Sequence, residues 1–408
     1  MKFTTYSIGA LVLSLSALTS CSSDDDSATP TNPTYEVPAT YTFQRNGTST
    51  IEFSGQTSRL QMLNEMGAQF TMAATNGTAL SASQLSNMYS NQNSPFSSSE
   101  LNDSGKNIKS KTAASSDYFN TFLGGGSTIE KTAVQAFFES QFQIGADASQ
   151  GNSASAGVAG SYLDGSKMRL FAANGLEPQQ ILLKGMMGAM MMDQISNNYL
   201  STLKLDGGSN VLENTNKVLS ANENFTTMEH YWDEAYGYVY GADESATNSK
   251  KFWSSYIDQV TADADFGSTA NDINLAFRKG RAAIVANDYS TRDQQINIIQ
   301  SKLALVSAVR AVYYLQEGKG KLVQDNGAKA FHALSEGYGF IMSLRYTREP
   351  ATDNPYFSKS EIDAMLATLV SGPNGLWDID NLSPKLDALS SQIATKFGFT
   401  VAQAATVN

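Results

Sequence analysis

His230-Tyr-Trp-Asp-Glu-Ala-Tyr-Gly-Tyr238 and His332-Ala-Leu-Ser-Glu-Gly-Tyr-Gly-Phe340 carry histidine, glutamate, tyrosine and glycine at the same offsets. These two stretches contain both histidines of the 408-residue chain. Residues four apart lie on the same face of a helix, so each histidine would stack on its own glutamate. The recurrence predicts an internal duplication with one special helix face in each copy.

The flanking sequence predicts helices around both motifs. Thr226-Thr-Met-Glu229 is a capping box that starts the first motif helix just before His230, and Asp325 or Asn326 caps the second motif helix. A further capping box, Ser127-Thr-Ile-Glu130, opens an upstream helix.

An apolar run over 181–203 precedes the first motif, and another over 292–316 precedes the second. Of nine prolines, only Pro178 lies between Phe96 and Glu349, and a long stretch without proline favours helices. We therefore expect an all-α fold, a duplicated helical bundle with two pseudo-symmetric halves and repeats at about 178–245 and 290–346.

The start of the predicted domain, which covers 41–404, carries a hairpin signal. Tyr41-Thr-Phe43 and Ile51-Glu-Phe53 flank Asn46-Gly47, a dipeptide that favours a tight turn between two strands. We expect this small N-terminal β-hairpin to be the one clear piece of sheet. Residues 76–116, which are rich in Ser and Asn, predict a long loop with short helical pieces.

The N-terminus has the features of a processing signal over residues 1–20. Lys2 precedes the apolar stretch Ile8–Leu18, which is too short to span a membrane. Leu18-Thr-Ser-Cys21 resembles the lipobox of bacterial lipoproteins, and Cys21 is the only cysteine. The resemblance implies lipidation at Cys21 and an outer-membrane lipid as the partner of that anchor.

Residues 21–40 predict a lipidated tether that is acidic and rich in proline. Its first part, Cys21-Ser-Ser-Asp-Asp-Asp26, is similar to the export signal of Bacteroidetes surface lipoproteins. A plain soluble tether is the alternative interpretation. We expect an outer-membrane location that is lipid-anchored and exposed on the cell surface.

The charge of the chain excludes one class of partner. Its formal net charge is −11 at pH 7. Nucleic acid binding requires a basic surface, so we expect no nucleic acid partner.

The two motifs offer candidate metal ligands, namely His230 with Glu234 and His332 with Glu336. Imidazole and carboxylate groups together suit iron or zinc. Two ligands per helix are few, so the motifs would need to converge or recruit a further acid such as Asp233. The alternative is that each His–Glu pair is structural and holds two helices in register.

The remaining motif residues are candidate lining for such a site: Tyr236, Gly237, Tyr238, Tyr338 and Gly339. The glycines follow the glutamates by about one turn, where a side chain would crowd a crossing helix. No catalytic residue is predicted, because a serine or cysteine triad needs a histidine that these motifs do not leave free. Five methionines between Met186 and Met192 predict an adaptable core helix, with copper(I) binding as the alternative.

With these features together, the chain resembles imelysin-like proteins. His230–Tyr238 and Ala276-Phe-Arg-Lys-Gly-Arg281 look closest to a related group of Bacteroidetes lipoproteins, which is classified as a domain of unknown function. The imelysin signature is Gly-x-His-x-x-Glu, whereas here Met228 and Ala330 occupy the glycine position and the glutamate comes one residue later.

The resemblance implies a role near iron uptake, and less directly a metal-dependent peptidase. We expect a non-enzymatic binding protein on the cell surface, with iron or zinc as its ligand. A structural or glycan-binding partner of an outer-membrane uptake complex is the further alternative.

Overall fold

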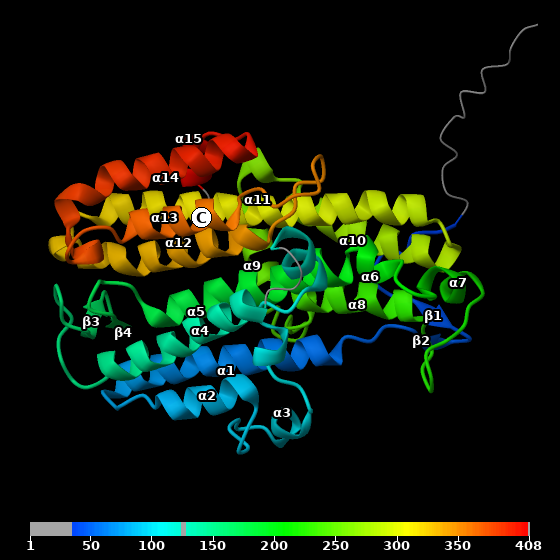
Figure 1. Cartoon of the computed structure of the whole chain (residues 1–408), viewed down its shortest axis with the longest axis horizontal. Helices are drawn as coiled ribbons and strands as arrows, with labels where there is room; N and C mark the ends of the chain where they lie inside the picture. Colours follow the sequence, from blue (N-terminus) through cyan, green and yellow to red (C-terminus); the bar gives the residue numbers. More distant parts are fainter. Residues whose placement is uncertain (1–34, 124–127, 407–408) are drawn as a thin grey trace, which may run out of the picture. The chain divides into compact units, whose positions relative to one another are not determined.

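Helix α11, Tyr289–Lys321, extends along most of the molecule's long axis and forms the centre of its core (Figure 1). The computed structural model describes residues 35–123 and 128–406. The apolar stripe predicted for α11 is buried, with Ile299, Leu303 and Val306 fully enclosed. By length and composition this helix could cross a membrane, but 72% of its most apolar window is buried within the protein.

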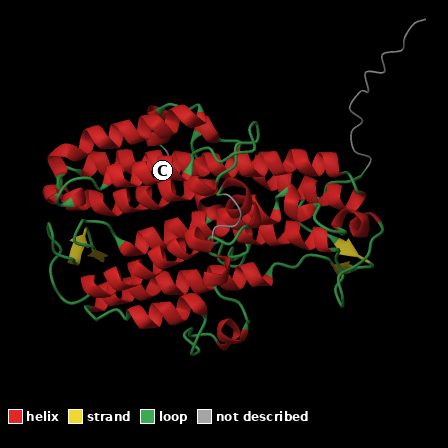
Figure 2. Cartoon of the chain, viewed as in Figure 1, coloured by secondary structure: helices red, strands yellow, loops and turns green. Residues whose placement is uncertain are grey.

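The prediction of a mostly helical protein is confirmed (Figure 2). The longer helices are α1 Ser54–Asn76, α2 Ala82–Ser90, α4 Thr128–Ala148, α5 Pro178–Met186, α8 Thr227–Tyr240, α9 Trp253–Thr261, α10 Thr269–Ala286, α12 Phe331–Ser343, α13 Lys359–Leu369 and α14 Leu382–Phe397. The shorter helices are α3 Ser99–Asp103, α6 Thr202–Leu205, α7 Asn210–Thr215 and α15 Val401–Ala405.

Short 3-10 and π segments connect these helices. The 3-10 turns are Lys109–Lys111, Ala264–Phe266, Asp325–Ala330, Leu344–Tyr346, Gly375–Trp377 and Ile379–Asn381. The π segments are Tyr118–Phe122, Met187–Met192 and Ile195–Tyr199. The predicted loop over 76–116 contains α2, α3 and one 3-10 turn, in agreement with its expected short helical pieces.

The helices from Val37 onward form one compact unit around α11. Helices α10 and α12 pack against α11, as do α14 and α9. Helix α5 packs against α12 and α4, while α1 packs against α8 and α5. In Figure 1, α14 lies on one side of α11 and α12, and α1, α2 and α4 lie on the other side.

The sheet prediction is correct at one hairpin and wrong in excluding others. Strands β1, Gln44–Arg45, and β2, Thr48–Ser49, pair around the expected turn at Asn46-Gly47, but the predicted strand segments Tyr41–Phe43 and Ile51–Phe53 lie outside them. A second hairpin joins β3, Gly160–Asp164, to β4, Lys167–Phe171. Its turn contains Gly165 at φ 63°, and Asp164-Gly165 is a dipeptide that favours such a turn.

Two predicted helices differ in detail from the structure. The run over 181–203 is an α-helix only to Met186, and the two π segments follow. A π turn takes one more residue than an α turn, which apolar spacing alone does not reveal. The second motif helix begins at Phe331 rather than at Asp325 or Asn326, because Asn326 and Gly327 adopt positive φ angles and interrupt it.

Four predictions fall on residues that the structure does not describe. The signal sequence, Cys21 and most of the tether lie within residues 1–34. The predicted cap of α4 at Ser127 also lies outside the described residues. These four features therefore remain sequence predictions.

Candidate functional site

The first motif helix, α8, begins where the sequence indicated. Thr226 is its N-cap, and the predicted capping box with Glu229 is present. The Thr226 amide donates to the Glu229 carboxylate at 2.8 Å, and the Glu229 amide donates to the Thr226 hydroxyl at 3.3 Å. This start places His230 and Glu234 on one face of α8.

The first His–Glu pair is partly exposed. Nε2 of His230 lies 3.8 Å from Oε2 of Glu234, and their side chains are 28% and 17% exposed. Gln56 of α1 and the Tyr199 hydroxyl both donate to Oε1 of Glu234, at 2.8 and 3.1 Å. The His230 ring stacks on Phe225 at 4.6 Å, and its Nδ1 makes no hydrogen bond with any described residue.

The second pair is more tightly held. Nδ1 of His332 lies 2.6 Å from Glu177, and its Nε2 lies 3.6 Å from Oε2 of Glu336. The ammonium of Lys184 on α5 pairs with Oε1 of Glu336 at 3.1 Å, and the Tyr256 hydroxyl donates to the same oxygen at 3.4 Å. Burial by itself would raise the pKa of Glu336, but Lys184 and His332 outweigh it and lower that pKa.

The second pair is poorly arranged to chelate a single ion. Glu177 and Glu336 face opposite ring nitrogens of His332, and one metal can bind only one of those nitrogens. Within residues 35–123 and 128–406, no group of three or more His, Cys, Asp or Glu side chains is arranged to hold a metal ion. The two pairs are also held by different partners in the described chain, Gln56 and Tyr199 for one, and Glu177 and Lys184 for the other.

Asp233, the further candidate ligand, is engaged elsewhere. It is fully buried, accepts a hydrogen bond from the Tyr41 hydroxyl at 2.6 Å, and pairs with Nε of Arg281 at 2.9 Å. Arg281 also lies 3.3 Å from Glu229, which pairs with Arg45 at 2.9 Å. Burial alone would lower the pKa of Arg281, but the two carboxylates raise it above its usual value.

This buried ionic network was not predicted as a unit. Its acids lie in the first motif helix, but Arg281 comes from α10 and Arg45 from β1. The Arg281 stretch was noted in the sequence only as part of a family resemblance. A helical apolar pattern does not reveal that an arginine is buried. In the sequence, only the stretch Ala276–Arg281 pointed to this network.

The motif glycines allow helices to approach closely. A Cβ added to Gly237 would lie 2.5 Å from Cβ of Phe53, at the start of α1. A Cβ added to Gly339 would lie 2.4 Å from Cβ of Lys184 in α5. Real Cβ atoms do not approach so closely, so each glycine is needed where its helix crosses a neighbour.

The motif aromatics have different surroundings. Tyr236 stacks on Tyr41 with ring centroids 3.7 Å apart and an angle of 6° between the planes. Tyr238 is fully buried. Tyr338 is the exception, because it borders an open cavity. Burial raises the pKa of Tyr338 to about 12.

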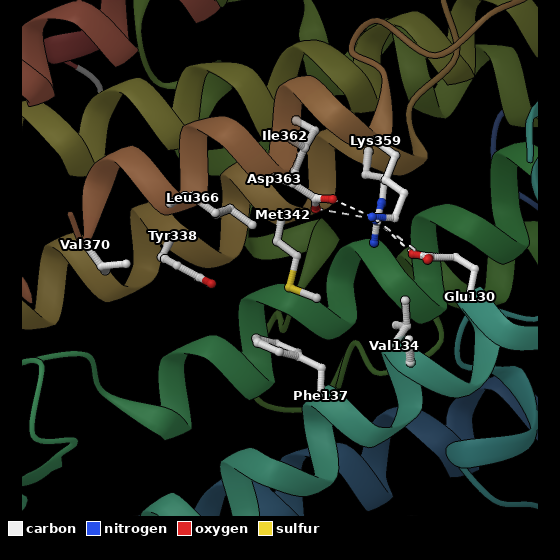
Figure 3. A pocket seen from close by; sticks show the side chains of 13 residues that line it. Glu130, Val134, Phe137, Tyr338, Met342, Lys359, Ile362, Asp363, Leu366 and Val370 are labelled. Carbon is white, nitrogen blue, oxygen red and sulfur yellow. Dashed lines mark hydrogen bonds and ion pairs between the residues drawn. The ribbon is translucent and has the colours of Figure 1, made fainter.

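That cavity is part of a groove between α4 and α13, with α12 beneath it (Figure 3). We call it the α4–α13 groove. A first cavity of about 370 Å³ adjoins a second of about 450 Å³, since Phe137, Tyr338 and Val370 line both. The other apolar residues of the first cavity are Ala133, Val134, Met342, Ile362, Leu366 and Ala367.

Two cations and two acids lie at one end of the first cavity. Arg345 lies 2.9 Å from Glu130 and 3.5 Å from Asp363. Lys359 pairs with Asp363 and lies 3.9 Å from Glu130 (Figure 3). The Arg345 side chain is only 7% exposed, and its Nε makes no hydrogen bond with a described residue. This end of the groove therefore presents both donors and acceptors.

Comparison with known proteins places most of the chain in one family. No curated protein and no solved structure matches it. The imelysin likeness therefore rests on the motif residues alone, while a family described as "Domain of unknown function (DUF4856)" matches residues 38–400. The chain therefore belongs to this domain-of-unknown-function family, DUF4856.

Proposed function

We propose that this protein is a lipid-anchored binding component of the outer membrane, exposed on the cell surface, and that it holds an amphiphile through an apolar chain in the α4–α13 groove. The lipobox ending at Cys21 and the Ser/Asp-rich residues after it support the anchor and the location. Function as a binding protein, rather than an enzyme, agrees with motif carboxylates that are engaged by neighbouring side chains.

The observation that carries this proposal is the groove itself. Its volume is in the range of small-molecule sites, which are typically about 300–1,000 Å³ and mostly apolar with a few polar groups. It is open, and its floor is built on α12, where Gly339 lets α5 pack closely from the adjacent side. A rigid floor beneath an open apolar channel suits the binding of an alkyl chain.

The binding test uses a neutral apolar dye, N-phenyl-1-naphthylamine, and the whole mature chain without its lipid. We expect dye fluorescence to rise when the dye binds the wild-type protein. The rise should be smaller with the Leu366→Lys variant, because the lysine places a charge in the groove. Equal dye binding by wild type and Leu366→Lys, with both proteins folded by circular dichroism, would reject the groove as the binding surface.

The location is tested on intact cells. Added protease should digest the protein without opening the outer membrane, because the anchor at Cys21 would hold it on the outer face. Protection of the protein until the outer membrane is permeabilised would reject surface exposure and leave the binding proposal standing.

We also propose that the two motif helices arose by duplication, because their contacts match. Glu234 accepts from a tyrosine and from Gln56, and Gln56 lies beside Gly237. Glu336 interacts with a tyrosine and with Lys184, and Lys184 lies beside Gly339. Matched contacts of this kind are expected if α8 with α1 and α12 with α5 descend from one helical pair.

Metal binding at the first pair is the second candidate function. His230 and Glu234 are partly exposed, their facing atoms are 3.8 Å apart, and Nδ1 of His230 is not engaged by a described residue. Two protein ligands would hold zinc or iron weakly, with water completing the coordination. Calorimetric titration of wild type and His230→Ala with zinc tests this proposal directly.

A further inference from the structure

A third cavity of different chemistry meets the α4–α13 groove at Lys359. This cavity measures about 460 Å³ and adjoins the first one, since Lys359 lines both. Three cavities therefore follow one another, and Tyr338 and Lys359 mark the two junctions. A ligand that fills all of them must be elongated.

The two ends of this series differ in polarity. The far apolar end is lined by Ile144, Ala159, Ala172, Leu176 and Ile181, with few polar side chains. The third cavity is lined by the aromatic residues Tyr118, Phe122 and Tyr356. Its polar lining residues include Glu349, Thr352, Asn354, Glu361 and Lys396. An alkyl chain suits the first end, and a polar head group suits the second.

The cations named at the polar end are already paired with acids. Arg345 and Lys359 are paired with Glu130 and Asp363 at the junction. In the third cavity, Lys396 lies 3.9 Å from Glu349, and Glu361 caps its own helix through Ser358. An added anion would meet four carboxylates at this end, in a protein of net charge −11.

An uncharged head group rich in hydroxyls avoids this repulsion. A hydroxyl both donates and accepts, so it can bond to the carboxylate oxygens of Glu349 and to the side chain of Asn354, which line the third cavity. Phe122 and Tyr356, which are half-buried, add apolar surface against which a sugar ring can pack.

We propose that the groove binds a single-chain glycolipid-type amphiphile, with its alkyl chain along α4 and α13 and its uncharged sugar-like head in the third cavity. This inference rests on the proposed function and adds the head group, its charge and the direction of the ligand.

The test is isothermal titration of the whole mature chain without its lipid, using three probes. Dodecyl maltoside, kept below its micelle concentration, carries both chain and sugar head. Maltose carries only the head, and dodecanoate carries the same chain length with an anionic head. We expect dodecyl maltoside to bind at least about tenfold more tightly than either of the other probes, a difference of about 1.4 kcal/mol.

A matched pair of variants on α13 locates the site. Ala367 lines the first cavity and is exposed, so Ala367→Trp should narrow the groove without disturbing the core. Ala364 is equally exposed on the same helix but does not border the three cavities. We expect Ala367→Trp to weaken dodecyl maltoside binding about tenfold and Ala364→Trp to leave it unchanged.

The outcomes separate this inference from the proposed function. Dodecanoate binding as tightly as dodecyl maltoside would overturn the uncharged head and leave a chain-binding groove intact. Maltose binding as tightly as dodecyl maltoside would overturn the alkyl chain. Binding that is unchanged by Ala367→Trp would show adventitious detergent on another surface and overturn the site. If neither probe with a chain binds, both the inference and the proposed function fail.

Discussion

The two motif helices carry the same four residue types at the same offsets, but the protein surrounds them differently. In α8, Glu229 and Asp233 join a fully buried network with Arg281, while His230 is half-exposed and loosely held. In α12, the position of Asp233 is occupied by Ser335, and His332 is fixed by the buried Glu177. The outer face of α12 then becomes the floor of an open groove.

The difference shows that the repeated motif specifies a close contact between two helices, which we call a packing joint, and does not by itself specify a binding site. Both glycines admit a neighbouring helix, and both glutamates bind that neighbour. What each joint supports depends on the next residues outward. Around α8 the N-terminal segment covers the helix through Tyr41 and β1, whereas beside α12 the space between α4 and α13 stays open.

The largest effect is expected for the network at α8. Arg281→Met leaves the buried Asp233 and Glu229 without their shared guanidinium, and the loss of one partner from a buried ion pair typically costs about 3–5 kcal/mol. Urea unfolding should show this loss. Lys279→Met, a half-buried position on the same helix, is the control and should change stability little. Equal stability of both variants would show that the ionic network does not stabilise the α8 region, and the two motif regions would not differ in this respect.

Substitution of the motif glycines should lower the free energy of unfolding by less than Arg281→Met does, and by similar amounts in both regions. Gly237→Ala and Gly339→Ala force a Cβ against Phe53 or Lys184, and overpacking of this kind costs about 1–3 kcal/mol. Gly320→Ala in α11 meets no atom within 4 Å and should instead stabilise the protein by up to about 1 kcal/mol. If only one motif glycine proves costly, the two joints are not equivalent.

The histidines should separate the two regions. His332→Ala removes the nearer of two charged partners of the buried Glu177, the other being Arg169 at 3.5 Å, and should cost about 1–3 kcal/mol. His230→Ala removes a partly exposed ring with one weak ion-pair contact, so its cost should stay below about 1 kcal/mol. Denaturant unfolding of both variants measures the difference. A larger loss for His230→Ala would reverse the assignment of the tightly held pair.

The smallest effect is expected from added zinc. At about ten times its dissociation constant, a ligand that binds only the native state stabilises it by about 1.4 kcal/mol, which for a chain of this size raises the melting temperature by about 2 °C. His230→Ala should abolish this shift, while His332→Ala should retain it. Loss of the shift in His332→Ala, or no shift in wild type, argues against a metal site on α8.

The sequence determined the helical class, the first hairpin, the capping box of α8 and the two His–Glu faces. These features depend on local spacing, on turn residues and on caps, which act over a few residues. The overlooked β3–β4 hairpin had the same kind of local signal in Asp164-Gly165. The π segments after Met186 and the break at Asn326 lay beyond the resolution of apolar periodicity.

Only the tertiary structure decided which neighbour each motif residue contacts. Glu177 reaches His332 across 155 positions of the chain, and Arg281 reaches Asp233 across 48. The groove is shaped by α4, α12 and α13, which are separate in sequence and meet only when the core has formed. The physical reason is that burial and charge pairing depend on packing between distant segments, whereas spacing along one helix fixes only which residues share a face.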